Sequence, residues 1–274
     1  MSLSQRPLGR TGQSVTLLGL GGEGILRTYG QERQAQAVIH AALEAGINYF
    51  ESARAYSGSE AYLGRGLKGH RRKIFLTSKS HARTRAEAEA HLRTTLANLN
   101  TDYLDLWQVH DVRTPEELTA LAAPGGALEA FRQAKQEGRV RFIGVTGHHD
   151  PQVLRQALSL EDFDTVLLPV NPAECHYRSF LPLAAAAAQQ GLGVVGMKVL
   201  CRGMLPQLKV PVKMLLAYAL SQPVSLVVVG ADSVAQVQEL LAAARDFQAL
   251  PPESQRHLEQ TVAPLARGLM YYKA

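Results

Sequence analysis

Short apolar segments alternate with segments of helical periodicity along this chain, and the alternation occurs eight times within 274 residues. Continuous apolar strands separated by helices are typical of a parallel sheet whose faces are covered by helices. Eight such units in a chain of this length predict a closed (β/α)8 TIM barrel. We expect one domain over 1–274, with a short N-terminal hairpin before the barrel and a C-terminal helix after it.

The eight predicted strands lie at 15–21, 47–51, 73–79, 103–110, 140–147, 165–171, 193–200 and 225–230. An open, doubly wound sheet gives the same alternation with fewer strands, and its marker is a G-x-G-x-x-G fingerprint after the first strand. The glycines after the first strand, at 19, 21, 22 and 24, are interpreted as having the wrong spacing for that fingerprint. Eight units therefore favour the closed barrel.

Helix boundaries agree with this segmentation. Gly46, Gly138 and Gly191 each follow a helical segment, where a residue with left-handed backbone commonly ends a helix. Asp150 and Asp232 precede helical segments and resemble N-terminal caps. The tail after residue 250 predicts one further amphipathic helix.

Composition is that of a globular protein, with 46% hydrophobic and 19% charged residues. The net charge of +5 comes from 29 basic and 24 acidic residues spread along the chain, which suits an anionic small ligand as well as nucleic acid. The mixed charges at 83–93 fit a solvated helix face better than a nucleic-acid strip. No signal-peptide core or membrane-length apolar run is present in the sequence, so we expect a cytoplasmic protein without a membrane partner.

Disulfides and metal sites are not expected. The two cysteines, Cys175 and Cys201, are too few for a disulfide framework. The segments GHHDP at 147–151 and ECH at 174–176 lack the ligand spacing of known metal motifs. The sequence therefore predicts no metal ion.

Polar residues stand where predicted strands end, and in a (β/α)8 barrel those ends share one mouth in which catalysis occurs. The candidates are Glu51, Tyr56, Lys79, His110, Thr146, His148, Asn171 and Lys198. A lysine in such a mouth needs a carboxylate beside it, and Glu51 lies one strand away from Lys79. An acid, a phenol, an amine and an imidazole are thus expected to converge.

At these residues the chain resembles the aldo-keto reductase family. The segment GINYFESARAYSGSEAYLG at 46–64 is similar to the family pattern G-x-N-x-x-D-T-A-x-x-Y-G-x-S-E-x-x-L-G. The family's strand-three lysine is matched by FLTSK, and its D-x-x-x-x-H by LDLWQVHD at 104–111. Further likeness in LGRTGQSVTLLGLGG, GRVRFIGVTG and GMKVLCRG extends the resemblance over nearly the whole chain.

The resemblance implies reduction of an aldehyde or ketone to an alcohol by hydride transfer from a nicotinamide cofactor. Tyr56 is then the general acid, Lys79 the cation that lowers its pKa, and Glu51 the carboxylate that holds Lys79. His110 orients the substrate carbonyl. The family has Asp at position 51, and the extra methylene of Glu moves the carboxylate by roughly 1.5 Å, so the contact to Lys79 must be rebuilt.

The resemblance also implies a cofactor site. Its expected residues are Gly22, Thr146, Gly147, His148, Asn171, Met197, Lys198, Leu200, Arg202, Gly230, Ala231, Asp232, Ser233, Gln236 and Glu239. The N-terminus of the helix after strand eight is suited to binding phosphate. Gly230 and Gln236 replace the Lys and Arg that usually hold a 2′-phosphate, and Lys198 or Arg202 supplies positive charge instead. We expect NADP, with NAD as the alternative.

Two other functions are compatible with the residues. A regulatory or sensing barrel binds the cofactor but has little turnover. This interpretation is favoured by Glu51 and by Thr146-Gly147, which replace the Ser-Asn pair that commonly contacts the nicotinamide carboxamide in the family. In an aldolase-type barrel, Lys79 is a Schiff-base nucleophile. The loop at 111–126 is short, which suggests an open site for bulky carbonyls.

Overall fold

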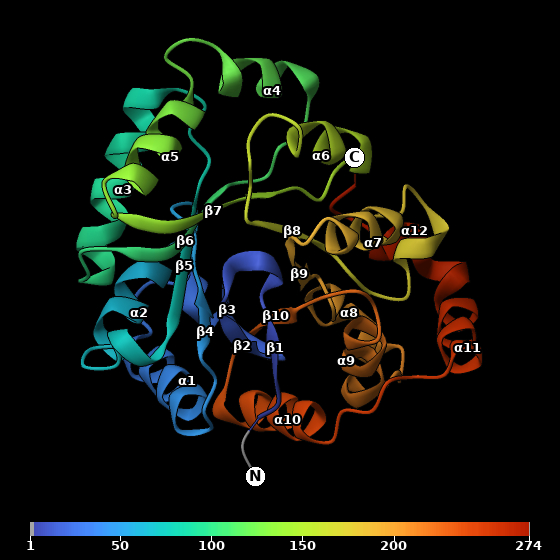
Figure 1. Cartoon of the computed structure of the whole chain (residues 1–274). Coiled ribbons are helices and arrows are strands. Elements are labelled where there is room, and N and C mark those ends of the chain that lie inside the picture. Colours follow the sequence, from blue (N-terminus) through green and yellow to red (C-terminus); the bar gives the residue numbers. More distant parts are fainter. Residues whose placement is uncertain (1–2, 274) are drawn as a thin grey trace.

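The computed structural model describes residues 3–273, and its centre is a closed barrel of eight parallel strands. Figure 1 shows the barrel with helices around its outside. The strands follow one another in chain order, and the last pairs with the first. They are β3 (Leu18–Gly24), β4 (Tyr49–Glu51), β5 (Phe75–Ser80), β6 (Leu104–Val109), β7 (Val140–Thr146), β8 (Thr165–Pro169), β9 (Gly193–Met197) and β10 (Leu226–Ala231). The predicted (β/α)8 barrel is confirmed.

The predicted first strand, 15–21, is divided between two elements. Val15 and Thr16 belong to β2 (Ser14–Thr16), which pairs antiparallel with β1 (Gln5–Pro7) in the expected N-terminal hairpin. The barrel strand starts only at Leu18. The two segments are contiguous and equally apolar, so the sequence pattern did not reveal the break.

The expectation that the glycines at 19–24 have the wrong spacing for a dinucleotide fingerprint is wrong, so spacing alone does not separate the two candidate folds. Gly19, Gly21 and Gly24 fit G-x-G-x-x-G, yet all three lie within the strand instead of in a turn that opens a helix. Gly19 and Gly24 are paired with β10 across the barrel seam. Closure of the sheet therefore decides for the barrel.

The N-terminal hairpin leads into the barrel interior. Leu8 and Val15 are fully buried and pack in a cluster with the inward-facing residues of the strands, among them Tyr49 and Phe75. The turn between β1 and β2 is held to the start of β9, because Arg10 N donates to Gly191 O at 2.7 Å. The hairpin therefore fills the end of the barrel at which the strands begin.

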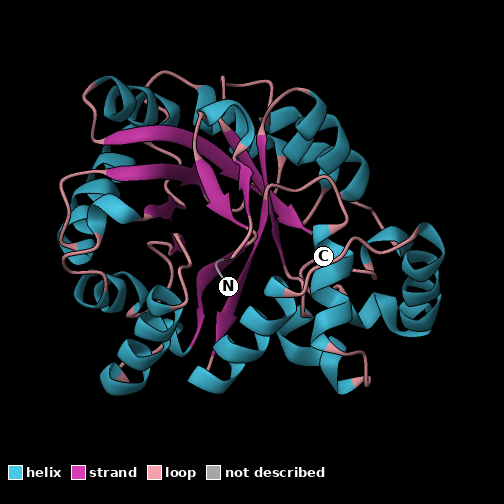
Figure 2. Ribbon diagram, turned by 60° about the horizontal axis from the view of Figure 1, so that its bottom comes forward, coloured by secondary structure: helices cyan, strands magenta, loops and turns pink. Residues whose placement is uncertain are grey.

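Helices cover the barrel on the outside, as Figure 2 shows in cyan around the magenta strands. They are α1 (Glu32–Glu44), α2 (Ser59–Gly66), α3 (Arg85–Leu99), α4 (Pro115–Ala122), α5 (Ala127–Gln136), α6 (Pro151–Ala157), α7 (Leu181–Gln189), α8 (Met204–Gln207), α9 (Val212–Leu220), α10 (Val234–Arg245), α11 (Pro252–Val262) and α12 (Ala266–Leu269). The main hydrophobic core lies between these helices and the outward faces of the strands.

The expected helix boundaries are largely confirmed. Gly46, Gly138 and Gly191 have φ values of 86°, 72° and 81°, which glycine adopts without strain. Asp150 caps α6 by accepting from Gln152 N at 2.7 Å. The expected cap at Asp232 is wrong by one residue, because Ser233 is the residue whose hydroxyl accepts from the first turn of α10.

Two segments differ from expectation. The predicted short loop at 111–126 contains α4, whose N-terminus is capped by Thr114. The tail forms α11 as expected, but the chain then continues through α12 and returns to the barrel mouth. Figure 1 shows this tail in red beside α7. Within residues 3–273, none of the helices combines the length and apolar character needed to cross a bilayer.

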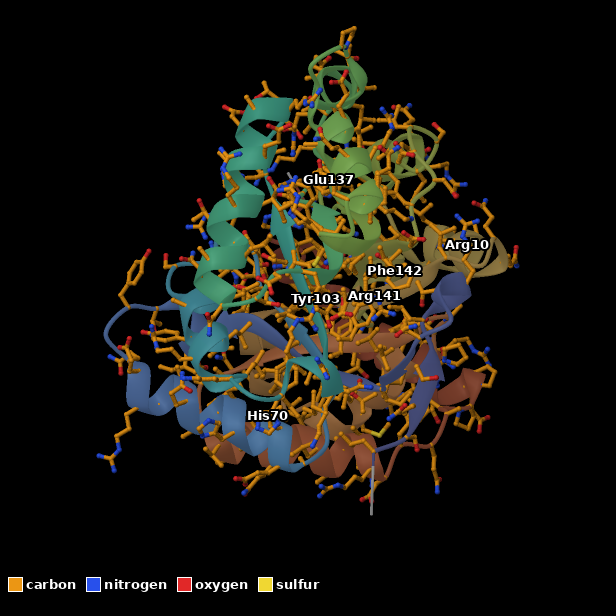
Figure 3. All side chains as sticks on the ribbon, turned by 60° about the vertical axis from the view of Figure 1, so that its left-hand side comes forward. Arg10, His70, Tyr103, Glu137, Arg141 and Phe142 are labelled. Carbon is orange, nitrogen blue, oxygen red and sulfur yellow. The ribbon has the colours of Figure 1, made fainter. Side chains whose placement is uncertain are left out.

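The end of the barrel opposite the mouth is tied by ion pairs. Asp105, almost fully buried on β6, accepts from Arg71 and Arg141 at 2.7 Å each. The Arg71 guanidinium also lies 3.7 Å from the ring centroid of Tyr103. Figure 3 labels Tyr103 and Arg141 close together on this side. These contacts hold the starts of β6 and β7 together, at the end of the barrel away from the mouth.

Candidate active site

A cleft of about 690 Å³ opens where the barrel strands end. Tyr56, Lys79 and His110 all line it, and they come from the ends of three neighbouring strands. Strand periodicity explains this convergence. Side chains two residues apart share a face, so Lys79 and His110 lie on the same inward face as the interior residues Phe75 and Leu106.

Glu51 and Lys79 form a buried ion pair beneath the cleft. Lys79 Nζ lies 2.8 Å from Glu51 Oε1, and the two side chains are 1% and 5% exposed. Lys79 also donates to Ser52 O at 2.9 Å. The other carboxylate oxygen of Glu51 accepts from Gln108 Nε2 at 3.4 Å. The longer Glu side chain therefore reaches the lysine, as the sequence analysis required.

The ammonium lies against the aromatic ring of Tyr56. Lys79 Nζ is 4.8 Å from the centroid of that ring. On another side, the His110 ring stands edge-on to Tyr56 with centroids 5.7 Å apart. The structure thus brings together the four residues that the strand ends suggested.

The pKa of Tyr56 is shifted in the direction opposite to the prediction. It lies well above the ordinary value of 10.0, chiefly because burial disfavours the phenolate. The charges of Glu23 and Glu51 raise it further, and Arg27 lowers it. The phenol therefore keeps its proton at neutral pH, which a proton donor requires.

His110 is a neutral imidazole in this environment. Burial lowers its pKa well below 6.5, and the charges of Lys79 and His148 lower it further. Its backbone N–H donates to Ser80 O at 2.8 Å, which fixes the start of the loop. Its Nδ1 is buried and has no partner among residues 3–273. A neutral imidazole has one donor and one acceptor, so it can orient a polar group.

Several expected cofactor residues line the same cleft. They are Thr146, His148, Met197, Lys198 and Arg202. Leu167 on β8 lines it as well. These residues give the cleft two cations and an apolar thioether on the side of β8 and β9.

Other expected cofactor residues do not line this cleft. Asn171 is fully buried, and its amide donates to Tyr272 Oη at 3.0 Å and to Lys198 O at 3.2 Å. Gly22 is packed so closely that an added Cβ would lie 2.5 Å from Ser59 Oγ. Gly147 and Ala231 are buried, and Leu200 packs against the hydrophobic clusters. These five residues are held by packing or hydrogen bonds within the protein, and their expected contact with a cofactor stays a prediction.

The remaining cofactor candidates surround the start of α10, outside the described cleft lining. Gly230 is half-buried at the end of β10, while Gln236 and Glu239 are exposed on the helix. Asp232 N donates to Gln236 Oε1 at 2.7 Å, and Ser233 Oγ accepts from Gln236 N at 3.3 Å. Gln236 thus acts here as a partner of the helix terminus.

Sequence reasoning missed two groups of cleft residues. Tyr271 and Tyr272 reach the cleft from the tail, 161 and 162 residues beyond His110 in the chain. Asp111 turns towards His148 and His149, with Oδ1 3.2 Å from His148 Nδ1 and Oδ2 3.6 Å from His149 Nε2. The doublet at 148–149 was visible in the sequence, but its carboxylate partner was not, because it comes from another strand.

Known proteins resemble this chain in sequence and in fold. The family model described as "Aldo/keto reductase family" matches residues 17–213. L-galactose dehydrogenase of Arabidopsis thaliana is 28% identical, and the match covers 89% of each chain. The holo form of an aldo-keto reductase from Bacillus halodurans has a TM-score of 0.79 at 24% identity, covering 94% of this chain and 96% of that one. An aldo-keto reductase from Klebsiella pneumoniae in complex with NADPH has a TM-score of 0.77 at 22% identity, covering 95% and 96%.

Proposed function

The chain belongs to the Aldo/keto reductase family, and from that premise we propose that it reduces a carbonyl compound to an alcohol with NADPH, with Tyr56 as the proton donor. The supporting observation is the buried pair of Lys79 and Glu51, 2.8 Å apart, with the Lys79 ammonium 4.8 Å from the ring centroid of Tyr56 in one cleft. When bound, NADPH supplies the hydride.

Tyr56 holds the proton that the reaction needs. Reduction builds negative charge on the carbonyl oxygen, and the Tyr56 hydroxyl gives its proton to that oxygen. Lys79 stabilises the phenolate that remains, because its ammonium lies against the ring. Glu51 and Ser52 O hold the ammonium in place by two contacts of 2.8 and 2.9 Å.

His110 orients the substrate. Its imidazole is neutral and stands edge-on to Tyr56, so it can hydrogen-bond the carbonyl oxygen beside the phenol without competing for the proton. The hydrogen bond from a neutral donor at this position becomes stronger as negative charge develops on the carbonyl oxygen.

The side chains and backbone groups on this side of the barrel mouth suit an anionic dinucleotide. Lys198 and Arg202 line the cleft and supply positive charge, while Met197 offers an apolar surface for a planar ring. Gly230 and Ser233 stand at the start of α10, where the first amide groups of a helix lack partners within the helix and suit phosphate. We propose NADPH as the preferred cofactor, with a direct comparison to NADH as the test of that preference.

The alternative functions have less support. The regulatory interpretation rested partly on Glu51, and the 2.8 Å contact to Lys79 removes that reason. A Schiff-base lysine must be accessible to the carbonyl carbon of its substrate. Lys79 is 1% exposed, and its ammonium is held by Glu51 Oε1 at 2.8 Å and Ser52 O at 2.9 Å.

The cleft favours a small polar carbonyl substrate over a large apolar one. Besides the proposed cofactor residues, its lining includes further charged or imidazole side chains, among them Glu23, His81, Arg83 and Arg113. Hydroxyl groups can form hydrogen bonds with such side chains, whereas aliphatic groups cannot. The Arabidopsis relative is named for a sugar, so hydroxylated aldehydes and aldoses belong in the first substrate panel. We further propose a cytoplasmic location, in keeping with two free cysteines.

The test compares wild type with Tyr56→Phe in NADPH oxidation against this panel. We expect kcat to fall by about 10²- to 10⁴-fold, the usual contribution of a general acid. The Kd for NADPH, measured by fluorescence titration, should not change. Tyr103→Phe is the matched control, because Tyr103 lies at the other end of the barrel. Equal kcat values for wild type and Tyr56→Phe would contradict the assignment of Tyr56 as the acid.

A further inference from the structure

We propose that Asp111, His148 and His149 form a binding site for one divalent transition-metal ion of the zinc type on the wall of the cleft. The three side chains come from two loops, after β6 and after β7. This proposal does not depend on the reductase activity.

The separations of the ligand atoms suit a single ion. Asp111 Oδ1 is 3.2 Å from His148 Nδ1, Asp111 Oδ2 is 3.6 Å from His149 Nε2, and one ligand atom from each residue lies within 4.8 Å of the others. Zinc binds nitrogen and oxygen at about 2.0–2.2 Å in tetrahedral geometry, which places neighbouring ligand atoms roughly 3.3–3.6 Å apart. Since no two of the three ligand atoms are more than 4.8 Å apart, they must close by at most about 1.5 Å to reach that spacing.

Two of these ligand atoms lack partners. Asp111 Oδ1 and His149 Nε2 are buried and accept or donate no hydrogen bond among residues 3–273. Buried polar atoms are nearly always satisfied, and leaving one unsatisfied costs free energy. An ion between them would satisfy both atoms at once.

The backbone holds the site in place before an ion arrives. Asp111 has a φ of 55°, and its N–H donates to Thr146 Oγ1 at 2.8 Å. Val112 N donates to Thr146 O at 2.9 Å. These bonds join the loop after β6 to the end of β7, only two residues before His148.

Arg113 is the competing cation. Its Nε and Nη2 donate to Asp111 Oδ2 at 2.8 and 2.6 Å, which leaves Oδ1 for an ion. The Arg113 side chain is 55% exposed, so it can move away without losing buried contacts. Removal of this guanidinium should therefore strengthen metal binding.

The ligand set selects the class of metal. Two imidazoles and one carboxylate suit Zn²⁺, Co²⁺ or Ni²⁺, whereas Mg²⁺ and Ca²⁺ prefer oxygen ligands alone. Three protein ligands leave a fourth position, and all three residues line the cleft. A water or a ligand in the cleft can complete the coordination.

The experiment titrates Co²⁺ into the full chain and follows its visible absorption, then displaces it with Zn²⁺. We expect one equivalent to bind with the intense bands of a four- or five-coordinate ion. His149→Ala and Asp111→Asn should each weaken binding by at least about tenfold, since even changes around a metal site cost 10- to 100-fold. Arg113→Gln should tighten it. His257→Ala is the matched control, because His257 is exposed on α11.

Circular dichroism melts accompany each variant. Asparagine tolerates the left-handed backbone of position 111, so Asp111→Asn should fold. If it does not fold, His148→Gln replaces it in the comparison. Absence of Co²⁺ binding, or binding of equal strength in wild type, His149→Ala and the second ligand variant, would overturn the proposal.

Discussion

Lys79 Nζ lies 2.8 Å from Glu51 Oε1, with almost no solvent exposure of either side chain. A buried pair of this kind contributes little net stability, but removal of one partner leaves the other charge uncompensated. The ion pair therefore positions the Lys79 ammonium more than it stabilises the fold. It fixes an ammonium against the ring of Tyr56 at the end of β4 and β5.

The first prediction concerns this pair. Lys79→Met should lower the free energy of unfolding by about 3–5 kcal/mol, because Glu51 is then buried without a cation. The double variant Lys79→Met/Glu51→Gln should lose clearly less, since both charges are gone. Urea denaturation of the wild type and the variants measures the difference. Equal losses in the single and the double variant would show that the carboxylate does not need the lysine.

The second prediction concerns pH. Glu51 raises the pKa of Tyr56, and a proton donor loses activity as the pH rises through its pKa. Glu51→Gln removes one raising charge and leaves Lys79 unopposed, so the pKa of Tyr56 should fall. The alkaline limb of the kcat/KM profile should then move to lower pH. Glu137→Gln should leave the limb where it is, because Glu137, labelled in Figure 3, is exposed and precedes the start of β7 at the end of the barrel opposite the mouth. A limb that stays or moves upward in Glu51→Gln would refute this coupling.

The third prediction concerns close packing of α2 on α3. A Cβ at Gly64 would lie 2.2 Å from Asn98 O and 2.9 Å from Leu99 Cα, which are backbone atoms that cannot move easily. Gly64→Ala should therefore destabilise the protein by about 1–3 kcal/mol through overpacking. Gly268→Ala in α12 meets nothing within 4 Å and should be neutral or stabilising by up to about 1 kcal/mol. Thermal melts of both variants test the contrast, and similar melting temperatures would contradict it.

The fourth prediction concerns the tail. Tyr272 Oη donates to Glu174 at 2.5 Å and accepts from Asn171 at 3.0 Å, all inside the protein. Tyr272→Phe leaves two buried groups short of a partner and should cost about 1–3 kcal/mol. Its neighbour Tyr271 is 37% exposed, and Tyr271→Phe should cost little. Urea denaturation compares the two, and equal effects would show that the hydroxyl contacts do not hold the tail.

Sequence reasoning succeeded where the signal is local or periodic. Eight apolar segments separated by helices predicted the barrel, because only parallel strands buried on both faces need such uninterrupted apolar runs. Alternation along each strand then placed Glu51, Lys79 and His110 at one mouth. The resemblance to a family, which the family match confirms, added their chemical roles as predictions.

The sequence failed where a contact joins distant segments. Asn171 looked like a free amide at a strand end, but the tail brings Tyr272 onto it, 101 residues further along. The raised pKa of Tyr56 depends first on burial and then on the charge of Glu23, neither of which can be read from its neighbours in the chain.

The sequence by itself thus determined the barrel and the strand-end chemistry, since hydrophobic period and strand ends are properties of short segments. Only the tertiary structure decided which polar groups stay free and which become partners. Asp111 meets His148 and His149 only because β6 and β7 lie side by side in the closed sheet and Thr146 ties their loops together. Such meetings depend on register and closure, and these are fixed by the packing of the whole chain.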